Sequence, residues 1–128
     1  MPRREESSSM PQKILLIVND APYGGERPYN AMRLALNLLK AKPAPALRIF
    51  LVGDGALCAK SGQTTPDGYY NIERMLKGVA VKGASVGVCG SCMDARGLQE
   101  SELLKGARRS SLDEMTEWTL EADKVLVF

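Results

Sequence analysis

Histidine is absent from the 128-residue sequence. Its absence excludes hydrolases that use a Ser-His-Asp triad and proteases that use a Cys-His pair, and it removes most kinds of zinc site. Any reactive nucleophile must therefore be activated by helix dipoles or by Arg and Lys side chains. We expect neither a metal nor an organic cofactor.

Long hydrophobic runs are also lacking. No apolar stretch approaches the roughly 18 residues that cross a membrane, so no membrane partner is expected. Residues 1–9 carry charge but no apolar segment of the kind found in signal peptides. Residues 1–12 are expected to form a disordered tail, in which Met10 is an alternative start.

Charge of either sign is not in large excess, because 17 Lys and Arg residues face 15 Asp and Glu residues, which gives a net charge of +2. No basic run interleaved with aromatics is present, so we expect no nucleic-acid partner.

Only three cysteines occur. An odd number of cysteines without a secretory signal indicates reduced thiols in a cytoplasmic protein rather than a disulfide scaffold.

The pattern of apolar residues predicts an α/β protein. Short, continuously apolar runs are typical of strands covered on both faces, and apolar residues at helical spacing predict amphipathic helices between them. The expected strands are 13–18, 47–52, 84–89, a brief edge strand at 107–110 and 124–128, and the expected helices are 26–40, 69–79, 100–106 and 111–122. This alternation predicts a parallel sheet with helices on both faces, in one domain that spans residues 13–128.

Three loops follow the carboxyl ends of the predicted strands, at residues 19–25, 53–68 and 89–96. Ligands of open parallel sheets bind outside these strand ends. The 53–68 segment is long and polar, with one helical turn expected at 56–60, and loops of this length are uncommon unless they are functional or mobile. The three loops are therefore expected to share one rim, where a functional site would lie.

The rim contains the clearest chemistry in the sequence, Cys89-Gly90-Ser91-Cys92. Cys89 ends an apolar strand, and the chain then turns through glycine into a predicted helix. Backbone N–H groups and the positive end of the helix dipole would stabilise Cys89 as a thiolate, the reactive form of cysteine. A free cysteine at a strand end is often a small buried hydrophobe, but this setting predicts a functional thiol.

Two residues that follow Cys89 could assist it. Cys92 gives the spacing of a thioredoxin-type dithiol, so the chain could be a dithiol redox protein, or Cys92 could resolve a sulfur adduct on Cys89. Arg96 could add positive charge, although an ordinary solvated arginine fits the sequence nearly as well. A single C-x-x-C without histidines is weak evidence for zinc.

The 53–68 loop contributes two further candidates. Cys58 is either an incidental residue of a one-turn helix or a thiol that faces Cys89, as a relay partner or across a subunit boundary. Tyr69 and Tyr70 end the loop. We expect these aromatics to pack or to form an oligomer contact rather than to bind substrate.

Several short motifs together resemble the DsrE/DsrF-like family over residues 13–128. They are Val18–Gly24, Arg27 with Asn30-Ala31, Val88-Cys89, Ala95–Gly97 and Ala122–Val125. The resemblance implies a three-layer α/β/α fold around a mostly parallel five-stranded sheet, and assembly into trimers or hexamers. It also implies a sulfur relay in which one cysteine carries sulfur as a persulfide between donor and acceptor proteins.

The position of the family's cysteine, at the end of the central strand and ahead of an Arg-Gly pair, matches Cys89. Cys92 has no counterpart in the relay pattern. The resemblance therefore implies a sulfurtransferase-like carrier with Cys89 as its site. A dithiol redox protein remains the alternative, as does an oligomeric binding or regulatory protein whose thiols have no catalytic role.

Overall fold

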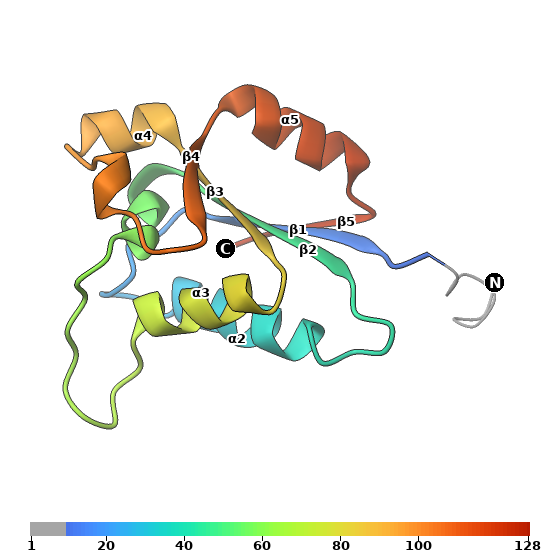
Figure 1. The fold of residues 1–128 in the computed structure, drawn as a ribbon, viewed down its shortest axis with the longest axis horizontal. Coiled ribbons are helices and arrows are strands. Elements are labelled where there is room, and N and C mark those ends of the chain that lie inside the picture. The colour runs from blue at the N-terminus through green and yellow to red at the C-terminus, as the bar shows by residue number, and fades with distance from the viewer. Residues whose placement is uncertain (1–9) are drawn as a thin grey trace.

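The computed structural model describes residues 10–128 and has a five-stranded sheet at its centre (Figure 1). The strands are β1 (Lys13–Val18), β2 (Ala46–Leu51), β3 (Ser85–Cys89), β4 (Ala107–Ser110) and β5 (Lys124–Val127). They lie in the order β4-β3-β2-β1-β5, and all neighbours are parallel. The sheet expected from the sequence is confirmed. Of the predicted tail, residues 1–9 lie outside the described part, and residues 10–12 are exposed and precede β1.

Helices cover both faces of the sheet, which gives the three-layer α/β/α arrangement (Figure 1). Helices α2 (Arg27–Leu38) and α3 (Ile72–Val81) lie on one face, and α5 (Leu112–Glu121) lies on the other. The chain moves from β1 to β4 in one direction and then returns to place β5 beside β1. Because parallel crossovers are right-handed, this reversal requires α5 to cross on the opposite face.

The two faces have hydrophobic cores of very different size. Ile14, Leu16 and Val18 of β1 point toward α2 and α3, where most of the buried side chains gather. The α5 face buries only a small cluster, Leu15, Ile17, Phe50 and Trp118. The alternation of side chains along β1 therefore explains why its residues after Lys13 are all buried.

The 53–68 segment differs from its prediction. Residues Gly53–Ala59 form a 3-10 helix, η1, which is longer than the single turn expected at 56–60. Ala56, Cys58 and Ala59 are fully or almost fully buried against the α2/α3 core. The segment was predicted to be a polar loop because small apolar residues among polar ones give little periodic signal.

The predicted helix at 100–106 is wrong beyond its first turn. Only Glu100–Glu102 are helical, as a short 3-10 helix, η2. After it, Leu103 pairs with Lys60 in an isolated bridge, and the Leu104 N–H donates to the Ala59 carbonyl at 2.8 Å. Leu104 is buried. These contacts with η1 hold the chain extended where local preference alone favoured a helix.

The helix expected at 69–79 begins three residues later, at Ile72. The Asn71 side chain caps it by accepting a hydrogen bond from the Arg74 N–H at 2.9 Å. Tyr69 and Tyr70 belong instead to an aromatic stack, in which Tyr70 also lies against Tyr23 and Tyr29. The packing role expected of the two tyrosines is confirmed.

Candidate functional site

Hydrogen bonds bring the three predicted loops together at the carboxyl end of the sheet. The Gly55 N–H donates to the Asn19 carbonyl at 3.1 Å, which joins the first loop to η1. The Gly53 N–H donates to the Cys92 Sγ at 3.1 Å, which joins η1 to the third loop. The shared rim expected from the sequence is therefore confirmed.

Cys89 is the last residue of β3 and the N-cap of α4 (Gly90–Ala95). The preceding Val86 and Val88 point into the α2/α3 core, so Cys89 lies on the other face, where it packs against the small cluster under α5. Its side chain is half-buried. The sulfur is thus fixed by the strand and still reachable from solvent.

Local hydrogen bonds lower the pKa of Cys89. Its partial burial acts in the opposite direction and raises the pKa, but the side chains of Cys92 and Ser91 and both of their backbone N–H groups outweigh burial by stabilising the thiolate. The Ser91 Oγ lies 3.3 Å from the Cys89 Sγ. Because α4 has only six residues, we assign the effect to these local donors rather than to a helix dipole.

Cys92 has the opposite character. It is half-buried and packs toward the α2/α3 core. Burial raises the pKa of Cys92, and the hydrogen bond to Cys89 and the Cys89 charge raise it further, against the lowering effects of the Gly53 N–H and Arg96. The motif therefore pairs a thiol that ionises readily with one that stays protonated beside it.

Arg96 binds the elements around Cys92 rather than Cys89 itself. Its Nε donates to Asp54 Oδ1 at 2.9 Å, and its Nη1 donates to the Cys92 carbonyl at 3.1 Å. It thus joins the end of α4 to η1, the same two elements that the Gly53–Cys92 hydrogen bond joins. The positive charge predicted for Arg96 is present at the site and acts on the Cys92 pKa.

Arg109, which no motif in the sequence singles out, lies near Cys89. Strand β4 pairs with β3 so that Arg109 is level with Val88. Its guanidinium lies over Gly90, so that a Cβ added to Gly90 would be only 2.8 Å from the Arg109 Cζ. The same guanidinium donates two hydrogen bonds to the Asp94 carboxylate, at 2.8 and 3.0 Å. Asp94 and Cys89 both raise the Arg109 pKa, so Arg109 in turn favours the Cys89 thiolate.

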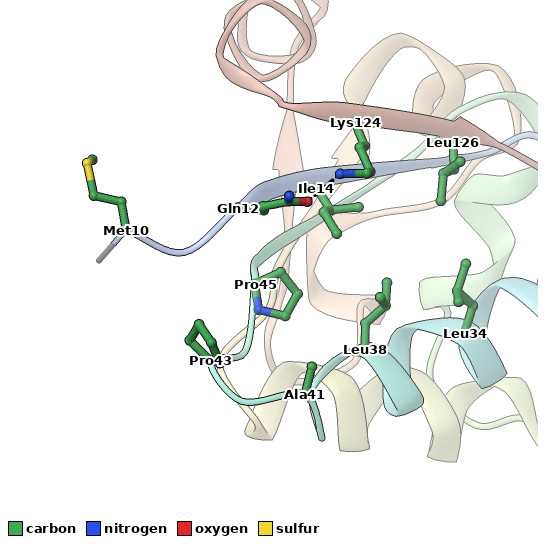
Figure 2. A pocket seen from close by; sticks show the side chains of 10 residues that line it. All are labelled: Met10, Gln12, Ile14, Leu34, Leu38, Ala41, Pro43, Pro45, Lys124 and Leu126. Carbon is green, nitrogen blue, oxygen red and sulfur yellow. Dashed lines mark hydrogen bonds between the residues drawn. The ribbon is translucent and has the colours of Figure 1, made fainter. Parts of the chain in front are cut away.

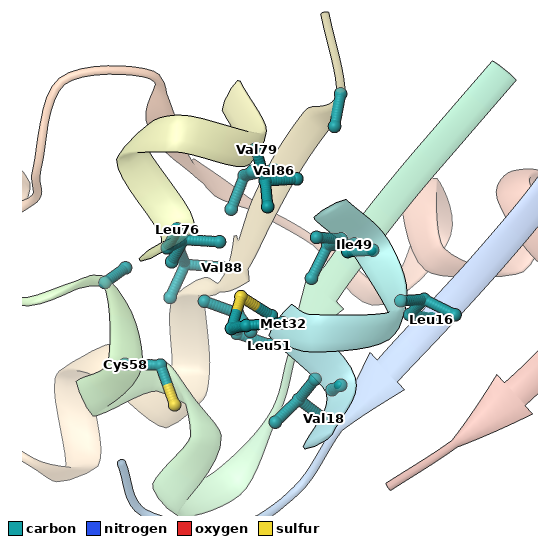
Figure 3. Close-up of a cluster of buried hydrophobic side chains, with 14 of the residues drawn as sticks. Leu16, Val18, Met32, Ile49, Leu51, Cys58, Leu76, Val79, Val86 and Val88 are labelled. Atoms are coloured by element: carbon teal, nitrogen blue, oxygen red, sulfur yellow. The ribbon is translucent and has the colours of Figure 1, made fainter. Parts of the chain in front are cut away.

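Cys58 lies in the hydrophobic core, as Figure 3 shows. Only 1% of it is exposed, and its Sγ lies 3.6 Å from the Asp20 carbonyl oxygen. Burial, with the charge of Asp20, raises the pKa of Cys58 to about 12. It is therefore a neutral core residue, and no subunit boundary could reach it without opening η1.

The apolar hollow in Figure 2 is separate from the thiols. It has a volume of about 270 Å³ and lies at the amino ends of β1 and β5, bordered by α2 and by the loop before β2. Among the lining residues within 10–128, Lys124 alone is charged. Within residues 10–128, no cluster of Cys, Asp or Glu side chains could hold a metal ion, and no helix has the length and hydropathy to span a membrane.

The pKa pattern gives a first prediction, which concerns alkylation. The reaction of iodoacetamide follows the thiolate fraction, so its rate at Cys89 should rise with pH through a midpoint below 9.0, the ordinary value. The midpoint for Cys92 should lie above 9.0. Peptide mapping of the wild-type chain at low reagent excess measures both rates. Faster reaction at Cys92 than at Cys89 would overturn the assignment.

A pair of arginine variants serves as the control for this experiment. Arg109→Gln should raise the Cys89 midpoint, because it removes the positive charge over Gly90. Arg108→Gln should leave the midpoint unchanged, because the Arg108 side chain pairs with Glu114 and lies over the Trp118 ring. Equal effects of the two variants would show that only net charge matters.

A model of the DsrE/DsrF-like family matches residues 12–128. Protein YchN of Escherichia coli is 39% identical over 117 residues, which cover 91% of this chain and 99% of YchN. An uncharacterized protein of Methanocaldococcus jannaschii is 38% identical over 116 residues, with coverage of 91% and 99%.

Two solved structures share the fold of this chain. The crystal structure of YchN from E. coli matches with a TM-score of 0.86 over 91% of this chain and 99% of that one. A protein of unknown function from Methanobacterium thermoautotrophicum, at 13% identity, has the same fold with a TM-score of 0.74 over 91% of this chain and 99% of its own. The resemblance found in the short motifs thus extends over nearly the whole chain, and the protein belongs to the DsrE/DsrF-like family.

Proposed function

We propose that this protein carries sulfur as a persulfide on Cys89 and passes it to an acceptor protein. Membership of the DsrE/DsrF-like family indicates a sulfur-relay type of function. The observation that supports Cys89 as the carrier is its position, half-buried at the end of β3, with hydrogen bonds from Ser91 and Cys92 that favour the thiolate. Neither of the other two thiols combines access with a lowered pKa.

The transfer is a thiol–persulfide exchange. The Cys89 thiolate attacks the outer sulfur of a donor persulfide, R–S–SH, so that a new S–S bond forms at Cys89 and the donor leaves as its thiolate, R–S⁻. An acceptor thiolate then attacks the outer sulfur on Cys89 and restores the Cys89 thiolate. The positive charge of Arg109, close to Gly90, would stabilise the anionic outer sulfur between the two steps.

A sulfur donor should add one sulfur atom to Cys89. Reduced protein is incubated with a small-molecule thiol persulfide, and intact mass and peptide mapping then locate the added sulfur. Cys89→Ser should abolish the addition, Cys92→Ser should retain it, and Cys58→Ala should behave as the wild-type chain does. If no variant or wild-type chain gains sulfur on Cys89, the relay proposal fails, and the binding or regulatory alternative takes its place.

Assembly into a trimer or hexamer is part of the same proposal. On the β5 edge, Val127 is 64% exposed, and Leu120 of the adjoining α5 is 81% exposed. Apolar side chains of this size on neighbouring elements favour a subunit contact. The donor and acceptor proteins would then meet Cys89 on an oligomer, within a reducing compartment such as the cytoplasm.

Sedimentation at micromolar concentration tests the assembly. The wild-type chain should sediment as a trimer or hexamer, and Val127→Lys with Leu120→Lys should shift it toward the monomer. Val81→Lys is the matched control, because Val81 is 87% exposed on α3, on the other face of the sheet. A wild-type chain that sediments as a clean monomer would count against the relay assembly.

A further inference from the structure

We propose that Cys92 resolves the Cys89 persulfide within the same chain, so that the protein releases sulfide and becomes a Cys89–Cys92 disulfide. This activity rests on the proposed loading of Cys89 and goes beyond it. A pure relay would hold its sulfur until an acceptor arrives, whereas this chain would also act as a persulfide reductase. Its substrate class is the persulfides of thiols.

Cys89 and Cys92 occupy neighbouring positions at the start of α4. Cys89 is the N-cap, and Cys92 is the third residue of the helix. An N-cap side chain lies over the third helical residue, and side chains three apart on a helix have Cβ atoms about 5–6 Å apart. Cys92 lowers the pKa of Cys89, and Cys89 raises that of Cys92, so the two thiols lie close enough to influence each other. The two positions have the C-x-x-C spacing of dithiols that close to a disulfide.

The surroundings of Cys92 are suited to a thiolate at the moment of attack. The Gly53 N–H, from η1, points at the Cys92 Sγ at 3.1 Å. Arg96 holds the Cys92 carbonyl and Asp54 at once, so that α4 and η1 keep this distance. A core cysteine needs no such donor, as Cys58 shows with its contact to a carbonyl acceptor. The donor at Cys92 stabilises negative charge on the sulfur.

Loading of Cys89 also changes the charge that Cys92 experiences. In the resting dithiol the Cys89 thiolate and the hydrogen bond to it raise the pKa of Cys92. Only the fraction of loaded protein whose persulfide is protonated, Cys89–S–SH, can release HS⁻, and in this form Cys89 carries neither that charge nor that thiolate acceptor. The Gly53 N–H and Arg96, which lower the pKa of Cys92, then act without this opposition. Cys92 thus ionises more readily beside the protonated persulfide than in the resting dithiol.

The step balances as a two-electron exchange. The Cys92 thiolate attacks the inner sulfur of Cys89–S–SH, the Cys89–Cys92 S–S bond forms, and the bond to the outer sulfur breaks. The outer sulfur leaves as HS⁻ with the electron pair of that bond. The sulfane sulfur is reduced to sulfide, and the two cysteines are oxidised to the disulfide. A dithiol reductant from outside the chain restores the two thiols, because Cys58 is buried in the core.

The test uses the full chain, reduced and free of oxygen, with a stoichiometric small-molecule thiol persulfide as the probe. This donor leaves as a thiol, so sulfide comes only from resolution or from decay of the probe, and Cys89→Ser measures that decay. Wild type should release close to one equivalent of sulfide and show a Cys89–Cys92 disulfide by peptide mapping. Cys92→Ser should keep the added sulfur on Cys89 and release no sulfide above the Cys89→Ser background. Cys92→Ala, which adds no hydroxyl, should behave like Cys92→Ser.

The outcomes separate the two proposals. If wild type keeps its persulfide as long as Cys92→Ser does, with no disulfide, the resolving role of Cys92 is overturned and the relay function stands. If both Cys92 variants keep their near-native circular dichroism but gain no sulfur, the loading of Cys89 fails and this inference falls with it. A disulfide that forms equally without the probe would show oxidation unrelated to persulfide and would also overturn it.

Discussion

Gly55→Ala is expected to destabilise the fold by about 3 kcal/mol or more, at the upper end of overpacking effects. A Cβ at this position would lie 2.2 Å from the carbonyl oxygen of Val18 and 2.9 Å from its carbonyl carbon. These are backbone atoms of β1, the strand between β2 and β5, and they cannot rotate away. The Gly55 N–H is also committed to the Asn19 and Val52 carbonyls at 3.1 and 2.9 Å. The chain must therefore move η1 or break these bonds.

Gly78→Ala is the matched control. Gly78 lies inside α3, and a Cβ there would lie 3.8 Å from the Leu36 Cδ2, an ordinary contact. This variant should stabilise the protein by roughly 0.5–1 kcal/mol, because alanine favours the helix. Urea denaturation measures both variants. If Gly55→Ala costs less than about 1 kcal/mol, the close approach of η1 to β1 is not as described.

The Gly55 variant should also alter the thiol site. Gly53, which donates to the Cys92 Sγ, is two residues away on the same 3-10 helix. A shift of η1 would weaken that hydrogen bond, and the pKa of Cys92 would rise further because the donor favours the thiolate. Alkylation of Cys92 at a given pH should therefore slow in Gly55→Ala. Cys89, whose donors come from Ser91 and Cys92, should change less.

Trp118→Ala is expected to lower the free energy of unfolding by about 3–5 kcal/mol. Trp118 is 6% exposed and is the one buried residue of α5. Its ring packs edge-on against Phe50, with 5.9 Å between the ring centroids. The indole also lies so close to Gly87 that a Cβ added there would be 3.3 Å from it. Because the α5 face buries so few side chains, no neighbour can fill the space that the indole leaves.

Two arginines make the Trp118 prediction more specific. The guanidinium carbons of Arg48 and Arg108 lie 5.3 and 5.7 Å from the centroid of the indole ring. Each arginine also forms an ion pair with a glutamate of α5, Arg48 with Glu121 and Arg108 with Glu114. Trp118→Phe should recover much of the loss, since it keeps an aromatic ring for Phe50 and for the guanidinium groups. Denaturation by urea, followed by circular dichroism, checks both. A loss near zero in Trp118→Ala would mean that α5 is held by its ion pairs instead.

The strands could be predicted because their signal is local. Lys13–Val18 and Ala46–Leu51 are short apolar runs, and the structure confirms both within a residue. Their parallel arrangement follows from the helices between them. Cys89 could be placed at the carboxyl edge for the same reason, since it ends such a run and is followed by a glycine.

The rest of the site depends on pairs of residues that are far apart in the sequence. Arg109 reaches Gly90 only because β4 pairs with β3, and the sequence shows merely a brief strand at 107–110. Arg109 could have been identified as a site residue only by predicting that this strand pairs with β3. The contact of Gly53 with Cys92 has no local signal in the sequence. The start of η1 is positioned by hydrogen bonds to the carbonyls of Val18 in β1 and of Asn19 in the loop that follows β1, more than 30 residues earlier in the chain. For the same reason the sequence could not decide between an incidental Cys58 and one that faces Cys89.

The position of β5 beside β1 has a consequence for synthesis of the chain on the ribosome. The first strand pairs with the last one, and the Phe128 N–H donates to the Ile17 carbonyl at 2.8 Å. The Phe128 carbonyl in turn accepts the Asn19 N–H at 2.9 Å, at the start of the first rim loop. Strands β1 to β3 can therefore associate while translation continues, but β1 keeps an open edge until residues 124–128 emerge from the exit tunnel. During that interval the nascent chain exposes the unpaired backbone N–H and C=O groups of β1, where another chain could pair with it.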